Sequence, residues 1–366
     1  MYPMTFGVEE EFLVIDALDG ELVPRSKELL PEARQFLGEE VSPELNLCQI
    51  EVGTPVCRET TELRDHLARL RRGLCLAGTE LDLRIAATGT HPFTSWAEQE
   101  IDLSSERFSR IEDLYRIVAR QQVICGCHVH VGIDDPDLTI EVMNHVRPHL
   151  GALLALSANS PFWHGRDTGY DSYRMQVWER WPTAGLPPVL ADRAEYDALV
   201  SRLQGVGAIE DSTFLYWHVR PSAHYPTLEF RIGDVCLHVD DTVPYAALIR
   251  GLAWTTAMRC LEGSRPPIPE DDLILSAIWR AGRYGVSDEL VSPIDWCLKP
   301  AVEVLSETLD FARPGLDAHD DWDLVRDWVA QVLRDGNGAT RQRQAFERDG
   351  DPHSVIARIG LETVPA

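Results

Sequence analysis

The chain has 366 residues, with 34 lysine and arginine side chains against 59 acidic ones, which gives a formal charge of −25. This excess of negative charge repels phosphate backbones and anionic lipid, so we expect neither a nucleic-acid-binding protein nor a membrane-surface protein. Because 44% of the residues are hydrophobic, a folded core is expected. No linker or repeat interrupts the sequence, and we expect one domain over residues 1–366.

The N-terminal pattern, the apolar stretches and the cysteines indicate where the protein is expected to reside. The chain does not open on a basic region followed by an apolar run, and its longest apolar stretch, residues 150–158, is too short to cross a bilayer. Its eight cysteines are scattered without a C-x-x-C pair. We therefore expect a cytoplasmic protein with reduced thiols.

Hydrophobic periodicity predicts strands and helices that alternate irregularly along the chain. The expected strands cover residues 6–15, 48–53, 81–87, 123–133, 215–220 and 227–235. The expected helices cover residues 59–79, 104–120, 140–157, 192–203, 243–261 and 322–333. Many connections are longer than a single crossover helix, which disfavours regular βαβ winding. The pattern favours an α+β fold with a mainly antiparallel sheet.

Four of the expected strands carry their reactive side chains on one face only. Successive side chains alternate across a strand, so Glu9 and Glu11 share one face while Glu10 lies on the other. The same parity groups further polar side chains opposite apolar ones: Gln49 with Glu51, His128 with His130, and Glu229 with Arg231. We call the predicted surface that carries them the front face.

The front face has two interpretations. Polar and apolar alternation is also typical of an antiparallel sheet with one solvated face. A solvated face, however, usually carries Ser, Thr and Lys, whereas these positions are almost wholly Glu, His, Arg and Gly. Gathered carboxylates repel one another unless cations neutralise them, and oxygen-rich clusters with histidine suit Mg²⁺ or Mn²⁺. The four strands together therefore indicate a site.

Other chemistries are disfavoured by spacing. Cys125, Cys127, His128 and His130 resemble zinc ligands, but parity places the thiols and the imidazoles on opposite faces of one strand. The same parity argues against a Cys/His nucleophilic pair, and we interpret the cysteines as core residues. Only two of the 34 basic residues are lysines, and neither lies in a phosphate-loop motif, so any phosphate must be bound by arginine and metal.

Several blocks of the sequence resemble one known family, the bacterial carboxylate–amine ligases often called glutamate–cysteine ligase type 2. They occur in family order over about residues 5 to 345. The matching blocks are Gly7-Val8-Glu9-Glu10-Glu11-Phe12, Thr88-Gly89-Thr90-His91-Pro92-Phe93, Gly126-Cys127-His128-Val129-His130-Val131-Gly132, Leu156-Ser157-Ala158-Asn159-Ser160-Pro161, Asp167-Thr168-Gly169-Tyr170, Arg220-Pro221-Ser222, Leu228-Glu229-Phe230-Arg231 and Trp279-Arg280-Ala281 followed by Arg283-Tyr284-Gly285.

The resemblance implies a glutamine-synthetase-like fold, with a curved, mainly antiparallel sheet flanked by helices. It implies an ATP- and Mg²⁺-dependent ligase that joins a small carboxylate to a small amine through an acyl phosphate, most simply glutamate to cysteine. It also implies roles for front-face residues: Arg231 would steady the transferred phosphoryl group, and the metal ligands would be Glu9, Glu11, Glu51, His128 and Glu229. His130 is the expected further contact with substrate or phosphate.

Residues outside the four strands complete the expected site. Arg174, Arg166 and Tyr170 flank a glycine-containing loop and are candidates for binding substrate or phosphate. Arg280 and Arg283 are candidates for nucleotide phosphates, because their tract matches a family block. The aromatic residues at 178, 181, 216 and 217 are interpreted as core or rim residues.

One departure and two rival functions remain open. His218 stands where the family usually has aspartate, which puts the pairing of glutamate with cysteine in question. A phosphotransferase that releases a stable phosphorylated product, or a non-catalytic protein that binds ATP and metal, would use the same kind of sheet. Family analogy also suggests a homodimer.

Overall fold

A sheet of seven strands runs through the protein, whose computed structural model describes residues 4–364. Its strands lie in the order β2-β3-β1-β5-β9-β8, and β4 pairs with β1 beside this path. Every pairing is antiparallel, as the sequence predicted. The strands are β1 (Phe6–Asp16), β2 (Val41–Pro43), β3 (Gln49–Gly53), β4 (Leu83–Ala86), β5 (Gly126–Gly132), β8 (Val219–Pro221) and β9 (Thr227–Asp234).

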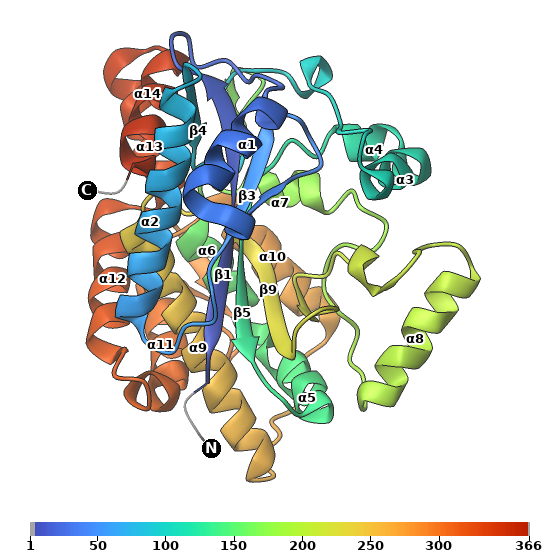
Figure 1. Cartoon of the computed structure of the whole chain (residues 1–366). Helices are drawn as coiled ribbons and strands as arrows, with labels where there is room; N and C mark the ends of the chain where they lie inside the picture. Colours follow the sequence, from blue (N-terminus) through green and yellow to red (C-terminus); the bar gives the residue numbers. More distant parts are fainter. Residues whose placement is uncertain (1–3, 365–366) are drawn as a thin grey trace.

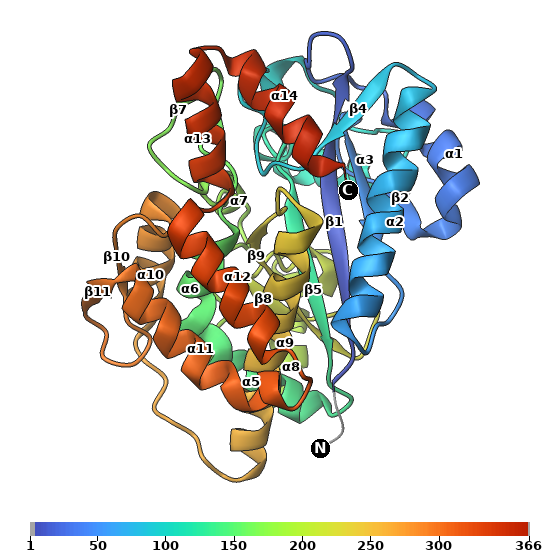
Figure 2. The ribbon, with the colours of Figure 1, turned by 90° about the vertical axis from the view of Figure 1, so that its left-hand side faces the viewer.

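Helices pack on the sheet and extend away from it (Figures 1 and 2). They are α1 (Ser26–Leu37), α2 (Thr60–Thr79), α3 (Glu106–Tyr115), α4 (Ile117–Arg120), α5 (Pro136–Val146), α6 (Leu150–Ser157), α7 (Tyr173–Trp178), α8 (Arg193–Gly205), α9 (Val239–Leu261), α10 (Asp271–Tyr284), α11 (Ala301–Asp317), α12 (Trp322–Asp335), α13 (Gly338–Asp349) and α14 (Pro352–Thr363). Two small hairpins, β6 (Phe162–Trp163) with β7 (Arg166–Asp167) and β10 (Glu289–Val291) with β11 (Leu298–Pro300), lie outside the main sheet.

The back of the sheet is apolar and packs against α2, α6 and α9. Val8, Val129 and Phe230 come from three neighbouring strands and belong to one buried cluster with leucines of α2 and α6 and aliphatic residues of α9. Glu10 also faces this side, as parity predicted, and is fully buried against Arg71 of α2. Cys127 belongs to the same cluster, and all eight cysteines are free thiols.

Two predicted helices are interrupted in the structure. Arg116, with φ of 51°, separates α3 from α4 within the segment 104–120. A short 3-10 turn at Arg147–His149 separates α5 from α6 within the segment 140–157. This turn contains Pro148, which has no backbone N–H to continue the helix. The strand predicted over 215–220 is shorter than expected and begins only at Val219.

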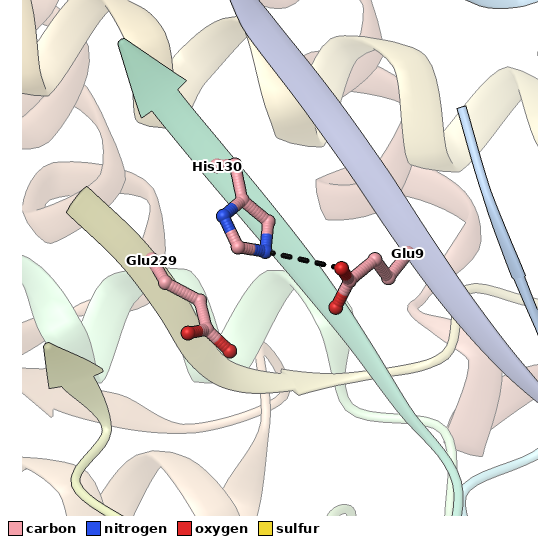
Figure 3. Close-up of side chains that lie close together, drawn as sticks. All are labelled: Glu9, His130 and Glu229. Carbon is pink, nitrogen blue, oxygen red and sulfur yellow. Dashed lines mark ion pairs between the residues drawn. The ribbon is translucent and has the colours of Figure 1, made fainter. Parts of the chain in front are cut away.

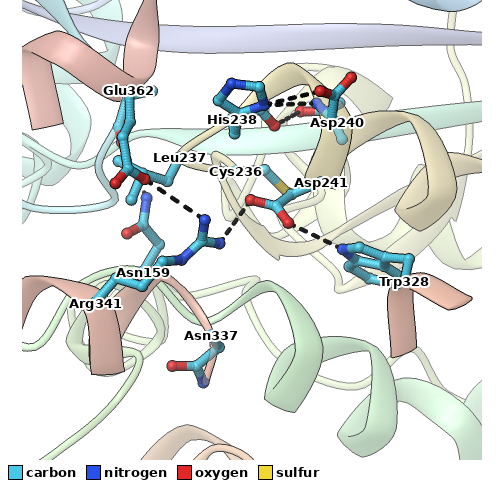
Figure 4. Close-up of polar contacts among 12 residues, drawn as sticks. Asn159, Cys236, Leu237, His238, Asp240, Asp241, Trp328, Asn337, Arg341 and Glu362 are labelled. Carbon is cyan, nitrogen blue, oxygen red and sulfur yellow. Dashed lines mark hydrogen bonds and ion pairs between the residues drawn. The ribbon is translucent and has the colours of Figure 1, made fainter. Parts of the chain in front are cut away.

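The C-terminal helices are tied to α9 by a partly buried polar network (Figure 4). Arg341 of α13 contacts Asp241 of α9 at 2.6 Å and Glu362 of α14 at 3.5 Å. The Nε1–H of Trp328 on α12 donates to Asp241 at 3.0 Å. Asp241 thereby joins α9, α12 and α13, and Arg341 adds α14 through Glu362. Between residues 4 and 364, no helix has the length and apolar character that a bilayer crossing requires. The expectation of a single domain over 1–366 stays a prediction.

Candidate active site

The front face forms a wall of a cavity of about 340 Å³. The lining of this cavity, which we call the catalytic cavity, includes the eight side chains that strand parity assigned to the front face: Glu9, Glu11, Gln49, Glu51, His128, His130, Glu229 and Arg231. Cross-strand pairing brings them together, with Glu9 opposite His128, Glu11 opposite Glu51, and His130 opposite Glu229. Directly opposed residues on a sheet have Cβ atoms only about 5 Å apart, so register alone concentrates these groups.

Carboxylates and imidazoles converge on shared points within the catalytic cavity. Figure 3 shows Glu9, His130 and Glu229 on three adjacent strands, with His130 Nε2 3.4 Å from a carboxylate oxygen of Glu9. Three overlapping groups place one ligand atom per residue within 4.8 Å of one another: Glu9, His130 and Glu229; Glu9, Glu51 and His128; and Glu11, Glu44 and Glu51. Such spacing suits divalent cations bound by oxygen and imidazole nitrogen.

The electrostatics of the acidic cluster also favour bound cations. Burial, together with the charge of Glu44, raises the pKa of Glu11 to about 7. Burial and the charges of Glu9 and Glu44 hold the pKa of Glu51 well above its ordinary value. In the protein alone these acids would therefore retain protons near neutral pH. A bound cation would supply the missing positive charge and allow them to ionise.

His128 tests whether the residues fit a metal ion. Its side chain is buried, and its two ring nitrogens lie 3.5 Å from Glu9 and 3.6 Å from Glu11. Neither nitrogen has a hydrogen-bond partner in the described part of the chain. Burial, assisted by the positive charge of Arg231, lowers the pKa of His128 to about 4. A neutral imidazole with a free nitrogen is the form that coordinates metals. Buried polar atoms are normally satisfied, so these orphaned nitrogens fit a cation held between the carboxylates.

Two arginines lie at the β8–β9 side of the catalytic cavity. Arg220 Nε donates to Glu229 at 2.9 Å, and Arg231 Nη1 pairs with the other carboxylate oxygen of Glu229. Although burial would raise it, these two guanidinium groups hold the pKa of Glu229 well below its ordinary value. Nη1 of Arg220 is fixed by the backbone oxygen of Leu215 at 2.6 Å. The cavity thus combines an anionic metal-type cluster with two guanidinium groups, of which Arg220 is the more firmly held.

Several lining residues were missed by sequence reasoning or interpreted differently. Glu44 lies in the loop between β2 and β3, where strand alternation has no meaning, and Arg107 lies on α3. Trp178, Trp181 and Tyr216 belong to the buried core cluster, as expected, and in addition line the catalytic cavity. No periodic pattern in the sequence connects Glu44 or Arg107 with the front face.

A second cavity of about 720 Å³ adjoins the first and shares Glu9, Glu51 and His130 with it. Gly7 and Gly53 form part of its lining and leave the backbone of β1 and β3 open to it. A Cβ atom at Gly53 would approach only Glu9, at 3.8 Å, so internal packing does not require glycine there. The acidic cluster can therefore be reached from two sides.

Arg174, predicted to bind substrate or phosphate, is fully buried and is not among the residues that line either cavity. Its Nη2 donates to the backbone oxygen of Arg231 at 3.3 Å, and a Cβ at Gly126 would lie 2.3 Å from the same nitrogen. Gly126 in turn donates its N–H to Glu11 at 2.6 Å. Arg174 therefore lies behind the wall of the catalytic cavity rather than in it.

The other four predicted binding residues are brought together in part, and apart from the catalytic cavity. Arg283 lies 5.5 Å from the ring centre of Tyr170 and donates to the backbone oxygen of Gly169. Arg280 donates to the backbone of Glu289, while Arg166 is exposed on β7. Within residues 4–364, none of the four lines either cavity. Their assignment to substrate or nucleotide stays a prediction.

His218, the departure from the family pattern, is fully buried and absent from the described lining of both cavities. Burial, with the charge of Arg174 nearby, lowers the pKa of His218 to about 3. Its Nε2 lies 3.7 Å from Glu179. His218 therefore adds no cation beside the acidic cluster.

The chain is similar to proteins of one family over nearly its whole length. The model of the glutamate-cysteine ligase family 2 (GCS2) matches residues 5–358. A protein of Rhodopirellula baltica assigned as a glutamate–cysteine ligase 2 is 39% identical over 99% of this chain and 97% of its own length. One of Frankia casuarinae, assigned as a glutamate–cysteine ligase 2-2, is 42% identical over 98% of this chain, but the match covers 41% of that longer protein.

Solved structures share the fold at low sequence identity. A glutamate–cysteine ligase of Francisella tularensis, determined in complex with AMP, matches all of this chain and 89% of its own length with a TM-score of 0.74 and 13% identity. A bifunctional glutathione synthetase of Pasteurella multocida matches 99% of this chain and 52% of its own with the same TM-score and 15% identity. The expected fold class is confirmed. With its family model matched over nearly the whole length, the chain belongs to the glutamate-cysteine ligase family 2 and is an enzyme of the ligase class.

Proposed function

We propose that the chain joins a small carboxylate to a small amine at the expense of ATP and Mg²⁺, through an acyl phosphate. The observation that carries the proposal is the catalytic cavity, where a buried carboxylate–imidazole cluster lies beside two arginines. Glutamate is the proposed acid and cysteine, or a related amino compound, the proposed amine. Membership of the family supports this pair.

The residues that would hold Mg²⁺, or Mn²⁺, are Glu9, Glu11, Glu51, His128 and Glu229, with Glu44 as a further candidate. When bound, such cations neutralise the triphosphate and the attacking carboxylate together. The orphaned nitrogens of His128 and the raised pKa values of Glu11 and Glu51 support this assignment. Access to the cluster from two cavities supports a reaction in which nucleotide and acid meet at one point.

The protein's own groups have defined tasks in this proposal. Arg231 would grip the oxygens of the transferred phosphoryl group, because a planar guanidinium makes two parallel hydrogen bonds. His130 Nδ1 is hydrogen-bonded to Thr227 at 2.9 Å, which leaves Nε2 as the proposed contact with substrate or phosphate. The amine must attack uncharged, so its proton must pass to a neighbouring base or anionic group. Aromatic walls from Trp181 and Tyr216 would keep water from the acyl phosphate.

The test is phosphate release from ATP and Mg²⁺ in the presence of glutamate and a panel of amines, followed by mass spectrometry of the products. We expect release only when acid and amine are both present, with an amide as product. Glu9→Gln and Arg231→Ala should abolish it, whereas Arg326→Ala, on the exposed side of α12, should not. Full activity of both site variants would overturn the assignment of the site. A stable phosphorylated product would identify a phosphotransferase, and ATP binding without turnover a non-catalytic protein.

A further inference from the structure

Two guanidinium groups share one indole ring beside the catalytic cavity. The Cζ atom of Arg174 lies 5.2 Å from the ring centre of Trp178, and that of Arg231 lies 5.1 Å from it. Arg174 and Trp178 are one turn apart on α7, the spacing at which helix side chains become neighbours. Cations within about 6 Å of an indole face are attracted by its quadrupole. The ring is therefore a common support for both arginines.

Arg174 is a fixed member of this group. Its side chain is fully buried, and its guanidinium donates to the backbone oxygens of Arg231 at 3.3 Å and Ile232 at 3.5 Å. Asp234, also fully buried, lies 3.9 Å away and balances its charge. Moving Arg174 would leave these groups unpaired in the core, which is costly. Arg174 therefore anchors Trp178 to the strand that carries Arg231.

Trp178 is held on its polar edge as well. It is 6% exposed, and its Nε1–H donates to the backbone oxygen of Tyr216 at 2.9 Å. Rotating the ring would break this hydrogen bond and leave the donor buried without a partner. The indole of Trp178 is therefore held in one orientation, and it forms part of the wall of the catalytic cavity.

Arg231 needs such a support, because few other contacts restrain it. Nη1 pairs with Glu229, but the buried Nε has no hydrogen-bond partner among residues 4–364. The register of β5 with β9 shifts beside Arg231. Cys127 pairs with Gly233 and Val129 with Phe230, so β9 has one residue more than β5 between these pairs, as in a β-bulge. Such bulges redirect side chains beside active sites. The single ion pair with Glu229 does not fix the orientation of the guanidinium plane of Arg231. The indole face of Trp178 supplies a second restraint.

We propose that Trp178 is a positioning residue for Arg231, held in place by Arg174. The proposal rests on the proposed function only in so far as Arg231 acts on the transferred phosphoryl group. It also gives Arg174 a task that fits its burial, in place of direct contact with substrate. Gly126 is required by the same arrangement, since a side chain there would displace Arg174.

The experiment compares Trp178→Phe, which keeps an aromatic face, with Trp178→Leu, which removes it. Misplacing a catalytic group by about 1 Å costs roughly a hundredfold, so we expect kcat to fall between about tenfold and a hundredfold in Trp178→Leu and less in Trp178→Phe. KM for ATP and for the acid should change little. In an Arg231→Lys background, Trp178→Leu should have little further effect, because coupled residues are not additive.

A matched control and a readout independent of turnover complete the test. Trp322 lies under Arg313 with a Cζ-to-centre distance of 4.6 Å and lines neither cavity in the described part of the chain, so Trp322→Leu should leave kcat unchanged. Crystal structures should show Arg231 displaced in Trp178→Leu and in place in the control. Arg231 in its wild-type position, whatever the activity, would overturn the proposal. If Trp178→Leu does not fold, Trp178→Met, which also lacks an aromatic face, takes its place, and Arg231 in its wild-type position in that variant overturns the proposal. A wild-type protein without ligase turnover would refute the proposed function, while the structures would still decide the positioning.

Discussion

Glu9 and Glu10 are neighbours in β1, yet their replacement by glutamine should have opposite effects. Glu10 is 0% exposed and accepts hydrogen bonds from Arg71 Nε at 2.9 Å, Arg71 Nη2 at 2.6 Å and Thr242 Oγ1 at 2.7 Å. Glu10→Gln would leave the buried guanidinium without its counter-charge, a loss that costs about 3–5 kcal/mol. Arg71 keeps the backbone oxygens of Cys236 and Leu237, so we expect about 3 kcal/mol.

For Glu9 we expect the replacement to affect activity more than stability. Its side chain is 29% exposed, its nearest partners are imidazoles, and its charge contributes to raising the pKa of Glu51. Although burial would raise it, hydrogen bonds with His128 and His130 hold the pKa of Glu9 below its ordinary value, so its charge contributes to stability. Its repulsion of Glu51 offsets part of that contribution, so Glu9→Gln in metal-free protein should cost less than Glu10→Gln, about 1 to 2 kcal/mol. Its ligase activity should be lost, because an amide is a poor replacement for an anionic oxygen ligand.

The assay is denaturant unfolding of wild type and both variants in one chelating buffer, with phosphate release measured separately in Mg²⁺. The change in midpoint at constant slope gives the change in unfolding free energy. Equal destabilisation by the two substitutions would refute the assignment of opposite faces. A fully active Glu9→Gln would refute the role of the front face.

Three further predictions concern the cluster and its support. Burial and the charge of Glu44 raise the pKa of Glu11 from 4.5 to about 7. Between these pH values the folded metal-free protein holds a proton on Glu11 that the unfolded chain has lost. Its unfolding free energy should therefore fall as the pH rises from 4.5 to 7, by at most about 3 kcal/mol. Denaturation at pH 5 and pH 7 should show this fall in wild type and a flatter profile in Glu11→Gln. Gly126→Ala should cost about 1–3 kcal/mol of stability and reduce activity, because its Cβ would lie 2.3 Å from Arg174. The control is Gly205→Ala, which has open space around it and should be neutral or stabilising; thermal unfolding measures both variants. Chelation should abolish turnover, and in the absence of nucleotide Mg²⁺ should raise the melting temperature of wild type more than that of Glu11→Gln.

The sequence by itself determined the chemistry of the front face. A strand has a period of two, so the placement of Glu9 and Glu11 against Glu10 can be read without knowing any partner strand. The same reasoning assigned His128 and His130 to one side and the cysteines to the other, and the structure confirms this for both histidines and for Cys127. The alternation of side-chain direction is a local property of each strand, so it can be predicted without knowing how the strands pair.

Only the tertiary structure decided which residues outside those strands join them. Glu44 and Arg107 reach the catalytic cavity from a loop and a helix, where no period relates sequence position to direction. Arg174 has the sequence context of a binding loop, yet the packing of α7 against β9 buries it completely. The register shift in β9 likewise comes from the pairing of two strands about a hundred residues apart. Such contacts depend on how separate elements pack against one another, and no single segment of the chain contains that information.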